Sequence, residues 1–254
     1  MSSAPLPLPE RRRPAPLIAS ALFLSETIEG LDDGAGFLDR LTPAEAERLR
    51  QAGRAVGLAP GESVFTQGEP HEGIFLIESG RVRVFYSGPS GRQVTLAYWT
   101  PGHFIGGPSI SGGGVHQWSG VAIEPVRVTI LSSATLRGLV RQMPNFALCL
   151  IEALEAKGRC YTAMAQMLGT RSVIERLAQL LINLGALYGT PEDGTVVIRR
   201  RITHDEIAAL VGSTRQWVTM MLKRFQREGV IAIDRAHIRL VRPGRLQEIV
   251  LTEG

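Results

Sequence analysis

The chain has 254 residues, of which 44% are hydrophobic and 20% charged, and its formal net charge is +4 at pH 7. This apolar content suits one or two globular domains and excludes a wholly disordered chain. No apolar run reaches the roughly 18 residues of a membrane span, which excludes an integral membrane protein. The two cysteines, Cys149 and Cys160, are too few for a disulfide framework or a four-thiolate metal site, and we expect both to be buried in a helix.

Residues 1–35 are expected to form a flexible N-terminal extension. Pro and Ala recur around Arg11-Arg12-Arg13, and no periodic core pattern accompanies them. The apolar segment Leu17–Leu24 resembles a secretory signal only in part, because it is short and Glu26 and Glu29 follow at once. We therefore favour a tail with at most one short helix over a signal peptide.

Residues 36–142 are predicted to form a β-roll that a short helix precedes. Thr42 and Glu45 have capping-box spacing and Pro43 suits the first helical position, so this helix should run to about Ala55. Short strands follow with glycine turns every 8–12 residues, which is typical of a β-sandwich or jelly roll. The expected strands are Glu62–Thr66, Gly73–Glu78, Arg81–Ser87, Gln93–Trp99, Gly120–Ala122 and Arg127–Ser132.

A long helix is predicted over residues 143–170. After Pro144 the apolar residues follow helical spacing as far as Leu168. So long a helix needs a partner for its apolar stripe, and a second copy of the chain in a parallel coiled coil is the simplest one. A second helix, Arg171–Leu187, should follow before the chain loosens into a linker over Gly185–Gly194.

Residues 171–250 are predicted to form a basic nucleic-acid-binding domain. From position 199 to 245 there are eleven Arg or Lys and four Asp or Glu, a balance of +7, which leaves −3 for the remainder. Thr203 and Glu206 have capping-box spacing, a turn follows at Gly212, and a second helix should run to about Glu228. With a hairpin over 231–241, this is the pattern of a winged helix-turn-helix.

The second helix of this domain presents side chains that suit base recognition. Arginine pairs bidentately with guanine, and glutamine pairs with adenine. Trp217 is expected to pack in the domain rather than stack on a base. The predicted base-reading residues are Thr214, Arg215, Gln216 and Thr219, and the predicted phosphate contacts are Arg201, Thr203, Ser213, Lys223, Arg224 and Arg235.

The segment from Glu206 to Val218 resembles the recognition motif of the Crp/Fnr transcription regulators. Further segments of that family follow in order over residues 37–245, namely Pro60-Gly61-Glu62, Ile77 to Val82, Pro101 to Gly106 and Arg176-Leu177-Ala178. The resemblance implies an α+β fold: an N-terminal cyclic-nucleotide-binding-like β-roll (jelly roll), a long dimerisation helix and a C-terminal winged helix-turn-helix. It also implies a cytoplasmic homodimer that binds a palindromic operator in double-stranded DNA. Such a protein is not an enzyme, has no membrane partner, and contacts RNA polymerase if it activates.

The resemblance further implies an effector pocket in each β-roll. Its expected lining is Phe104, Ile105, Gly106, Gly107, Ser109, His116, Gln117, Trp118, Ser119, Tyr161 and Thr162. Members that bind cyclic nucleotides hold the phosphate with an Arg-Ser pair and the ribose with a Glu. In this chain Gly107 stands at the Glu position, and no arginine occurs between Arg92 and Arg127. We therefore expect an effector other than cyclic AMP, and the two cysteines exclude the iron–sulfur branch of the family.

Several alternatives stay open for this pocket. A small organic or nitrogen-cycle metabolite would be held by backbone amides and polar side chains, whereas haem would be ligated by His103, His116 or His71. A third alternative is constitutive DNA binding with no ligand. A cupin-type metalloenzyme is a remote alternative because the paired histidines and Glu of its metal site are absent, and Gly107–Ser111 is no strand-to-helix nucleophile turn. No catalytic residue, metal ligand or certain cofactor is assigned.

Overall fold

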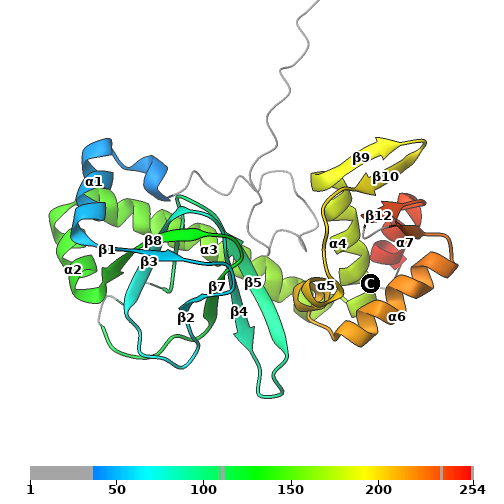
Figure 1. Cartoon of the computed structure of the whole chain (residues 1–254), viewed down its shortest axis with the longest axis horizontal. Helices are drawn as coiled ribbons and strands as arrows, with labels where there is room; N and C mark the ends of the chain where they lie inside the picture. Colours follow the sequence, from blue (N-terminus) through cyan, green and yellow to red (C-terminus); the bar gives the residue numbers. More distant parts are fainter. Residues whose placement is uncertain (1–36, 108, 110–111, 235–236, 253–254) are drawn as a thin grey trace, which may run out of the picture.

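The computed structural model describes residues 37–107, 109, 112–234 and 237–252. A β-roll and a mostly helical domain lie side by side along one long helix, α3 (Pro144–Thr170), which runs past the roll and ends at the second domain (Figure 1). The predicted extension, residues 1–35, lies outside the described residues. Within the described ranges, no helix combines the length and apolar content that crossing a membrane requires.

The chain enters the roll through a short 3-10 helix, Phe37–Arg40, and helix α1 (Pro43–Ala52). The capping box predicted at Thr42 and Glu45 is confirmed, because the Thr42 side chain accepts from the Glu45 amide and the Glu45 carboxylate accepts from the Thr42 amide. Helix α1 ends three residues before the predicted Ala55. The reason is tertiary: β1 (Arg54–Leu58) pairs with β8 (Val126–Ser132), and a β-carbon at Gly53 would lie 2.4 Å from Thr129 Cγ2.

Two four-stranded antiparallel sheets form the roll. Their strand orders are β1-β8-β3-β6 and β2-β7-β4-β5, and strands of both sheets contribute to one apolar core. The six predicted strands are confirmed to within one residue at each end, whereas β1 and the two-residue β6 were not predicted. The remaining strands of the roll are β2 (Ser63–Phe65), β3 (Gly73–Ser79), β4 (Val82–Ser87), β5 (Gln93–Trp99), β6 (Phe104–Ile105) and β7 (Ser119–Ala122).

Helix α3 has one face on the roll and one face in solvent. It begins at Pro144 as predicted, and Phe146 and Leu150 pack with α1, β3 and α2 (Ser133–Gln142) in a second apolar cluster. On the other face Leu148 and Ile151 have 60% and 62% of their surface exposed. Both cysteines lie on this helix, and they form no disulfide with each other; Cys149 is buried and Cys160 is half-buried.

The second domain contains four further helices and a third antiparallel sheet. Helix α4 (Val173–Tyr188) and the three helices that follow it share one core with strands of the sheet, whose order is β11-β12-β10-β9. The wing is therefore four-stranded rather than a two-stranded hairpin. Its elements are β9 (Gly189–Glu192), β10 (Thr195–Ile198), α5 (His204–Val211), α6 (Arg215–Arg227), β11 (Ile231–Asp234), β12 (His237–Leu240) and α7 (Pro243–Thr252).

The prediction of an irregular linker over Gly185–Gly194 is thus wrong. Its first residues continue α4, and its later ones form β9, which pairs with β10. The glycines that suggested flexibility instead permit close packing, because a β-carbon at Gly185 would lie 2.7 Å from Leu240 Cδ1.

The two domains contact each other where β5 meets α5. Tyr98, near the end of β5, is 4% exposed and belongs to the apolar core of the second domain together with Ile207 and Leu210 of α5. The hairpin of β4 and β5 and the helix α5 lie next to each other in Figure 1. A displacement of this hairpin therefore has a direct path into the second domain.

Candidate nucleic-acid interface and effector cavity

Local sequence signals build the pair of helices α5 and α6. The Thr203 hydroxyl accepts from the Glu206 amide at 3.1 Å and the Glu206 carboxylate accepts from the Thr203 amide, so the predicted capping box starts α5. Gly212 ends α5 with a left-handed backbone (φ 64°, ψ 47°), a conformation that glycine adopts at low cost. Thr214 then caps α6 by accepting from the Trp217 amide at 3.2 Å. The helix-turn-helix is therefore specified by residues close together in the chain.

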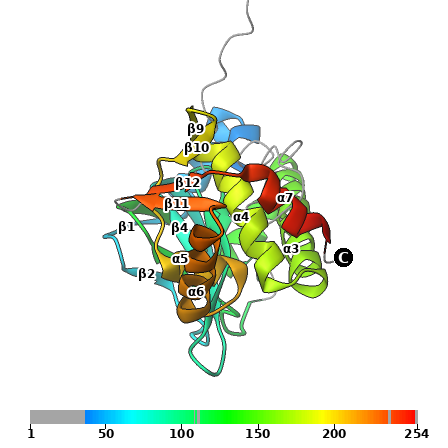
Figure 2. The same cartoon turned by 90° about the vertical axis from the view of Figure 1, so that its right-hand side faces the viewer.

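Helix α6 has one buried and one exposed face. Val218, Met221, Leu222 and Phe225 are buried in the domain core. Trp217 is half-buried and packs against the same core, as predicted. Figures 1 and 2 show α6 at the outside of the domain, away from the roll. Its outward face is therefore open to a partner as large as a duplex.

The four predicted base-reading residues differ in their surroundings. Arg215 and Gln216 are exposed at the start of α6, and Arg215 Nε lies 3.5 Å from Asp205 Oδ2 of α5. Thr214 is exposed, but its hydroxyl caps the helix. Thr219 is half-buried, and its hydroxyl hydrogen-bonds with His204 Nδ1 at 2.8 Å. Arg215 and Gln216 thus present the polar groups that face outward most directly.

The predicted phosphate contacts surround this surface. Arg201, Thr203, Lys223 and Arg224 are exposed, and Ser213 is half-buried. Arg224 Nε donates to Glu228 at 2.8 Å, and this bond lowers the pKa of the Glu228 carboxyl. Arg235 lies outside the described residues. Asp205 and His204, which contact Arg215 and Thr219, were not predicted as part of this surface; only their place in the first turn of α5 pointed to it.

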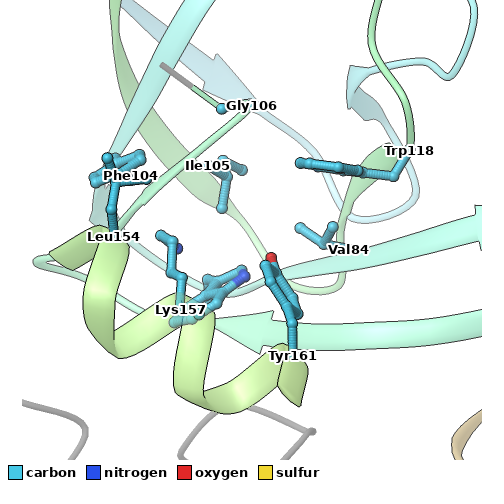
Figure 3. Close-up of a pocket in the computed structure, with 11 residues that line it drawn as sticks. Val84, Phe104, Ile105, Gly106, Trp118, Leu154, Lys157 and Tyr161 are labelled. Atoms are coloured by element: carbon cyan, nitrogen blue, oxygen red, sulfur yellow. The ribbon is translucent and has the colours of Figure 1, made fainter. Parts of the chain in front are cut away.

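A cavity of about 200 Å³ lies between the roll and α3 (Figure 3). Six of the residues expected in the pocket line it: Phe104, Ile105, Gly106, Gly107, Trp118 and Tyr161. Five residues that were not expected line it too: Val84, Trp99, Leu154, Lys157 and Gly158. The cavity is thus more apolar, and reaches further along α3, than the sequence suggested.

Five expected pocket residues lie outside this lining. Gln117 and Thr162 are exposed, and Ser109 is half-buried with its hydroxyl donating to the Gly113 carbonyl. Ser119 is buried, and its hydroxyl accepts from the Gln67 amide at 3.0 Å. His116 is buried beside the cavity rather than in its wall.

The three histidines considered for haem are held by the roll itself. The His116 ring packs against the rings of Phe65 and His71, each with a centroid distance of 4.5 Å. His71 Nε2 bonds with the Gly106 carbonyl at 2.7 Å, and His103 Nδ1 bonds with the Thr100 carbonyl at 3.1 Å. None of the three is among the cavity-lining residues. The roll would have to rearrange before any of them met a haem iron in this cavity.

Lys157, the lysine of α3, lies in the cavity wall. Its side chain is 9% exposed, and its Nζ lies 3.2 Å from the centre of the Trp99 ring and 4.9 Å from that of Phe104. Burial lowers the pKa of Lys157 to about 7. Burial also raises the pKa of Tyr161 to about 12, so its phenol stays protonated at neutral pH. Tyr161 also approaches Trp118, with ring centroids 6.5 Å apart.

Two family models match the chain. The model of the cyclic nucleotide-binding domain matches residues 55–143, and that of the Crp-like helix-turn-helix domain matches residues 175–249. A CRP-like cAMP-activated global transcriptional regulator from Mycobacterium tuberculosis is 29% identical, over 79% of this chain and 89% of that protein. The cyclic AMP receptor protein of Thermus thermophilus is 28% identical, over 74% of this chain and 84% of that protein.

Solved structures agree with this arrangement. A transcriptional regulator of the CRP/FNR family from Thermus thermophilus is 26% identical, with a TM-score of 0.56, over 79% of this chain and 100% of that chain. The c-di-GMP-responsive global regulator of Xanthomonas campestris has a TM-score of 0.68 at 20% identity, over 78% of this chain and 99% of that chain. At that identity the second likeness concerns the fold alone.

Proposed function

The chain belongs to the Crp/Fnr family of DNA-binding transcription regulators, and from this premise we propose that it acts as a cytoplasmic homodimer on a palindromic operator. We also propose that a small effector other than cyclic AMP controls it. The observation that carries the proposal is the exposed start of α6. Arg215 and Gln216 project there from a helix whose opposite face is buried in the domain core. These two side-chain types make bidentate pairs with guanine and adenine in the major groove.

The proposed working units are residues 36–142 for sensing, 143–170 for dimerisation and 171–250 for DNA binding. Support for dimerisation comes from the exposed apolar face of α3, where Leu148, Ile151 and Leu154 lie at helical spacing. An apolar stripe of this kind is buried when a second helix packs along it. Two copies joined along α3 would present two α6 helices to successive major grooves, which matches a two-fold symmetric operator. If the operator lies at a promoter that is activated, RNA polymerase is a further partner.

An effector other than cyclic AMP is supported by the cavity wall. Among the described residues no arginine lines it, so the bidentate clamp for a cyclic phosphate has no counterpart there. Gly107 has a φ of +82°, a backbone conformation that a glutamate at this position would adopt only with strain. The position of the three histidines favours a metabolite over haem as the effector.

A route from effector to DNA is also part of the proposal. Helix α3 lines the cavity through Lys157 and Tyr161 and ends at Thr170, next to the DNA-binding domain. A ligand in the cavity would bias how α3 and the β5–α5 contact are arranged. That bias would set the spacing of the two α6 helices in the dimer, a rigid-body switch.

Selection from random DNA duplexes tests the proposed function. The full chain should enrich a two-fold symmetric sequence whose half-sites are centred about one helical turn, roughly 10 base pairs, apart. The double variant Arg215→Ala/Gln216→Ala serves as the control and should enrich no sequence. Enrichment of unrelated sequences, or of the same palindrome by the control, would contradict base recognition by α6.

A further inference from the structure

The described lining of the cavity between the roll and α3 combines aromatic walls with a single cationic side chain. Trp99, Phe104, Trp118 and Tyr161 supply rings, and the other lining residues except Lys157 are aliphatic or glycine. Figure 3 shows Leu154, Lys157 and Tyr161 projecting from α3 toward the strands and loops of the roll. Such a wall favours a ligand with a planar apolar part and one negatively charged group.

Lys157 lacks an acidic partner in the part of the chain that the structure describes. Among the residues that the structure describes, no Asp or Glu carboxylate lies within ion-pair distance of its Nζ. Its contacts are the faces of the Trp99 and Phe104 rings, and the thiol of Cys160 is the ionisable group that influences it. A buried ammonium without a counter-ion is costly, and its pKa of about 7 reflects that cost. An anion that enters the cavity would offset it.

We propose that the cavity binds a small aromatic carboxylate, with its ring among the aromatic walls and its carboxylate against the Lys157 ammonium. This inference rests on the proposed function, because it names the chemical class of the effector. The size agrees: an engineered apolar cavity of about 150 Å³ accepts benzene, so about 200 Å³ accommodates one ring with a short acidic substituent. A larger ligand is disfavoured, because drug-sized pockets begin near about 300 Å³.

A carboxylate suits this cavity better than a phenol does. Carboxyl groups ionise near pH 4 and phenols near pH 10. At neutral pH, therefore, only the carboxylate carries a negative charge that can pair with the Lys157 ammonium. The Tyr161 hydroxyl, which stays protonated, is available in the same wall to donate a second hydrogen bond. A bound carboxylate would also raise the pKa of Lys157, so binding near pH 7.5 should take up protons.

Isothermal titration calorimetry of the full chain with benzoate and phenylacetate, against the neutral isostere benzamide, tests the proposal. Both carboxylates should bind at least about tenfold more tightly than benzamide, since a charge-assisted bond is lost with the amide. Titrations in buffers of different ionisation enthalpy should show proton uptake near pH 7.5. Lys157→Met should abolish both the preference for carboxylates and the proton uptake. Arg159→Met, which removes an exposed positive charge from the same helix, should leave both unchanged.

Three results would overturn the inference: no heat of binding with millimolar carboxylate, equal binding of benzamide and benzoate, or unchanged preference in Lys157→Met. The melting temperature of Lys157→Met shows whether the variant is folded, and it should not fall, because methionine fills the same space without a charge. The wild-type chain is assayed in parallel on the selected DNA sequence. Failure of carboxylate binding with intact DNA binding removes only this inference, whereas loss of sequence-specific DNA binding removes the proposed function.

Discussion

Arg215 Nε lies 3.5 Å from Asp205 Oδ2, so an ion pair joins the first turn of α6 to the first turn of α5. The two side chains are 68% and 71% exposed, and exposed pairs contribute only about 0–1 kcal/mol to stability. If Arg215 contacts DNA as proposed, the pair matters for binding instead, because a guanine or a phosphate must then compete with Asp205 for the guanidinium.

Replacing Asp205 with Asn should therefore change DNA affinity while leaving the stability of the fold nearly unchanged. The free energy of unfolding should change by less than about 1 kcal/mol. Affinity for all duplexes should rise, because one negative charge leaves a surface that faces phosphates. Fluorescence anisotropy at several salt concentrations measures this. Glu248→Gln, which removes a carboxylate from the exposed pair with Arg245 on α7, is the matched control and should leave DNA affinity unchanged. A loss of affinity in Asp205→Asn would show that the ion pair positions Arg215 productively.

Dimerisation along α3 predicts a specific effect of charge on its exposed face. Ile151→Glu should convert the dimer to a monomer, because a carboxylate would be buried without a partner where the two helices meet. Light scattering after size-exclusion chromatography measures the mass. Gln51→Glu adds the same charge to exposed surface on α1 and should leave the mass unchanged. A dimer that persists in Ile151→Glu would place the contact between copies elsewhere.

The parts of the fold that depend on neighbouring residues could be predicted from the sequence. The starts of α1 and α5 and their capping boxes depend on residues within a few positions of one another, and the patterns at Thr42 and Thr203 predicted them correctly. The six main strands were predicted from their spacing between glycine turns. Features that depend on distant packing were missed. The early end of α1 follows from the fit of Gly53 against Thr129, and β9 follows from pairing with β10.

Only part of the candidate cavity was predicted, because the rest of its lining depends on how distant elements pack. Family resemblance placed Phe104 to Gly107 and Trp118 in the pocket, because they lie in segments with recognisable motifs. Lys157 carries no such motif and looked like one charge on a long helix. Its place in the cavity wall depends on which face of α3 meets Trp99, which only the packed structure reveals.

Burial of His116 predicts a loss of stability in mild acid. Burial lowers the pKa of His116 below 6.5, the neighbouring His71 lowers it further, and Glu69 and Glu72 oppose the shift. Below pH 6.5 the unfolded chain therefore binds more protons at this residue than the folded chain, so stability present above pH 6.5 is lost as the pH falls. Urea unfolding of the wild-type chain between pH 7.5 and pH 5 should show this decline, and His116→Gln should show a shallower one. His237→Gln, in the wing, should behave as wild type; equal slopes in all three would contradict the assignment.

The turn between α5 and α6 predicts opposite effects of two glycine substitutions. Gly212→Ala should destabilise the chain by about 1–3 kcal/mol, because its φ of 64° is strained for alanine. A β-carbon there would also lie 3.3 Å from Leu168 Cδ2. Gly138→Ala, within α2 and with no atom near its β-carbon position, should stabilise by about 0.4–1 kcal/mol. Thermal unfolding measures both, and a stable Gly212→Ala would show that the turn tolerates a side chain.

Base reading by Arg215 is the central claim, and affinities for single-base variants of the selected operator test it most directly. Arg215→Ala should cost about 1–3 kcal/mol on the best sequence and erase the preference at one guanine of each half-site. Lys223→Ala, as a phosphate contact, should weaken binding to every variant by a similar factor and reduce its salt dependence. If Arg215→Ala instead weakens all sequences equally and keeps every base preference, α6 does not read the operator through Arg215, and the account is contradicted.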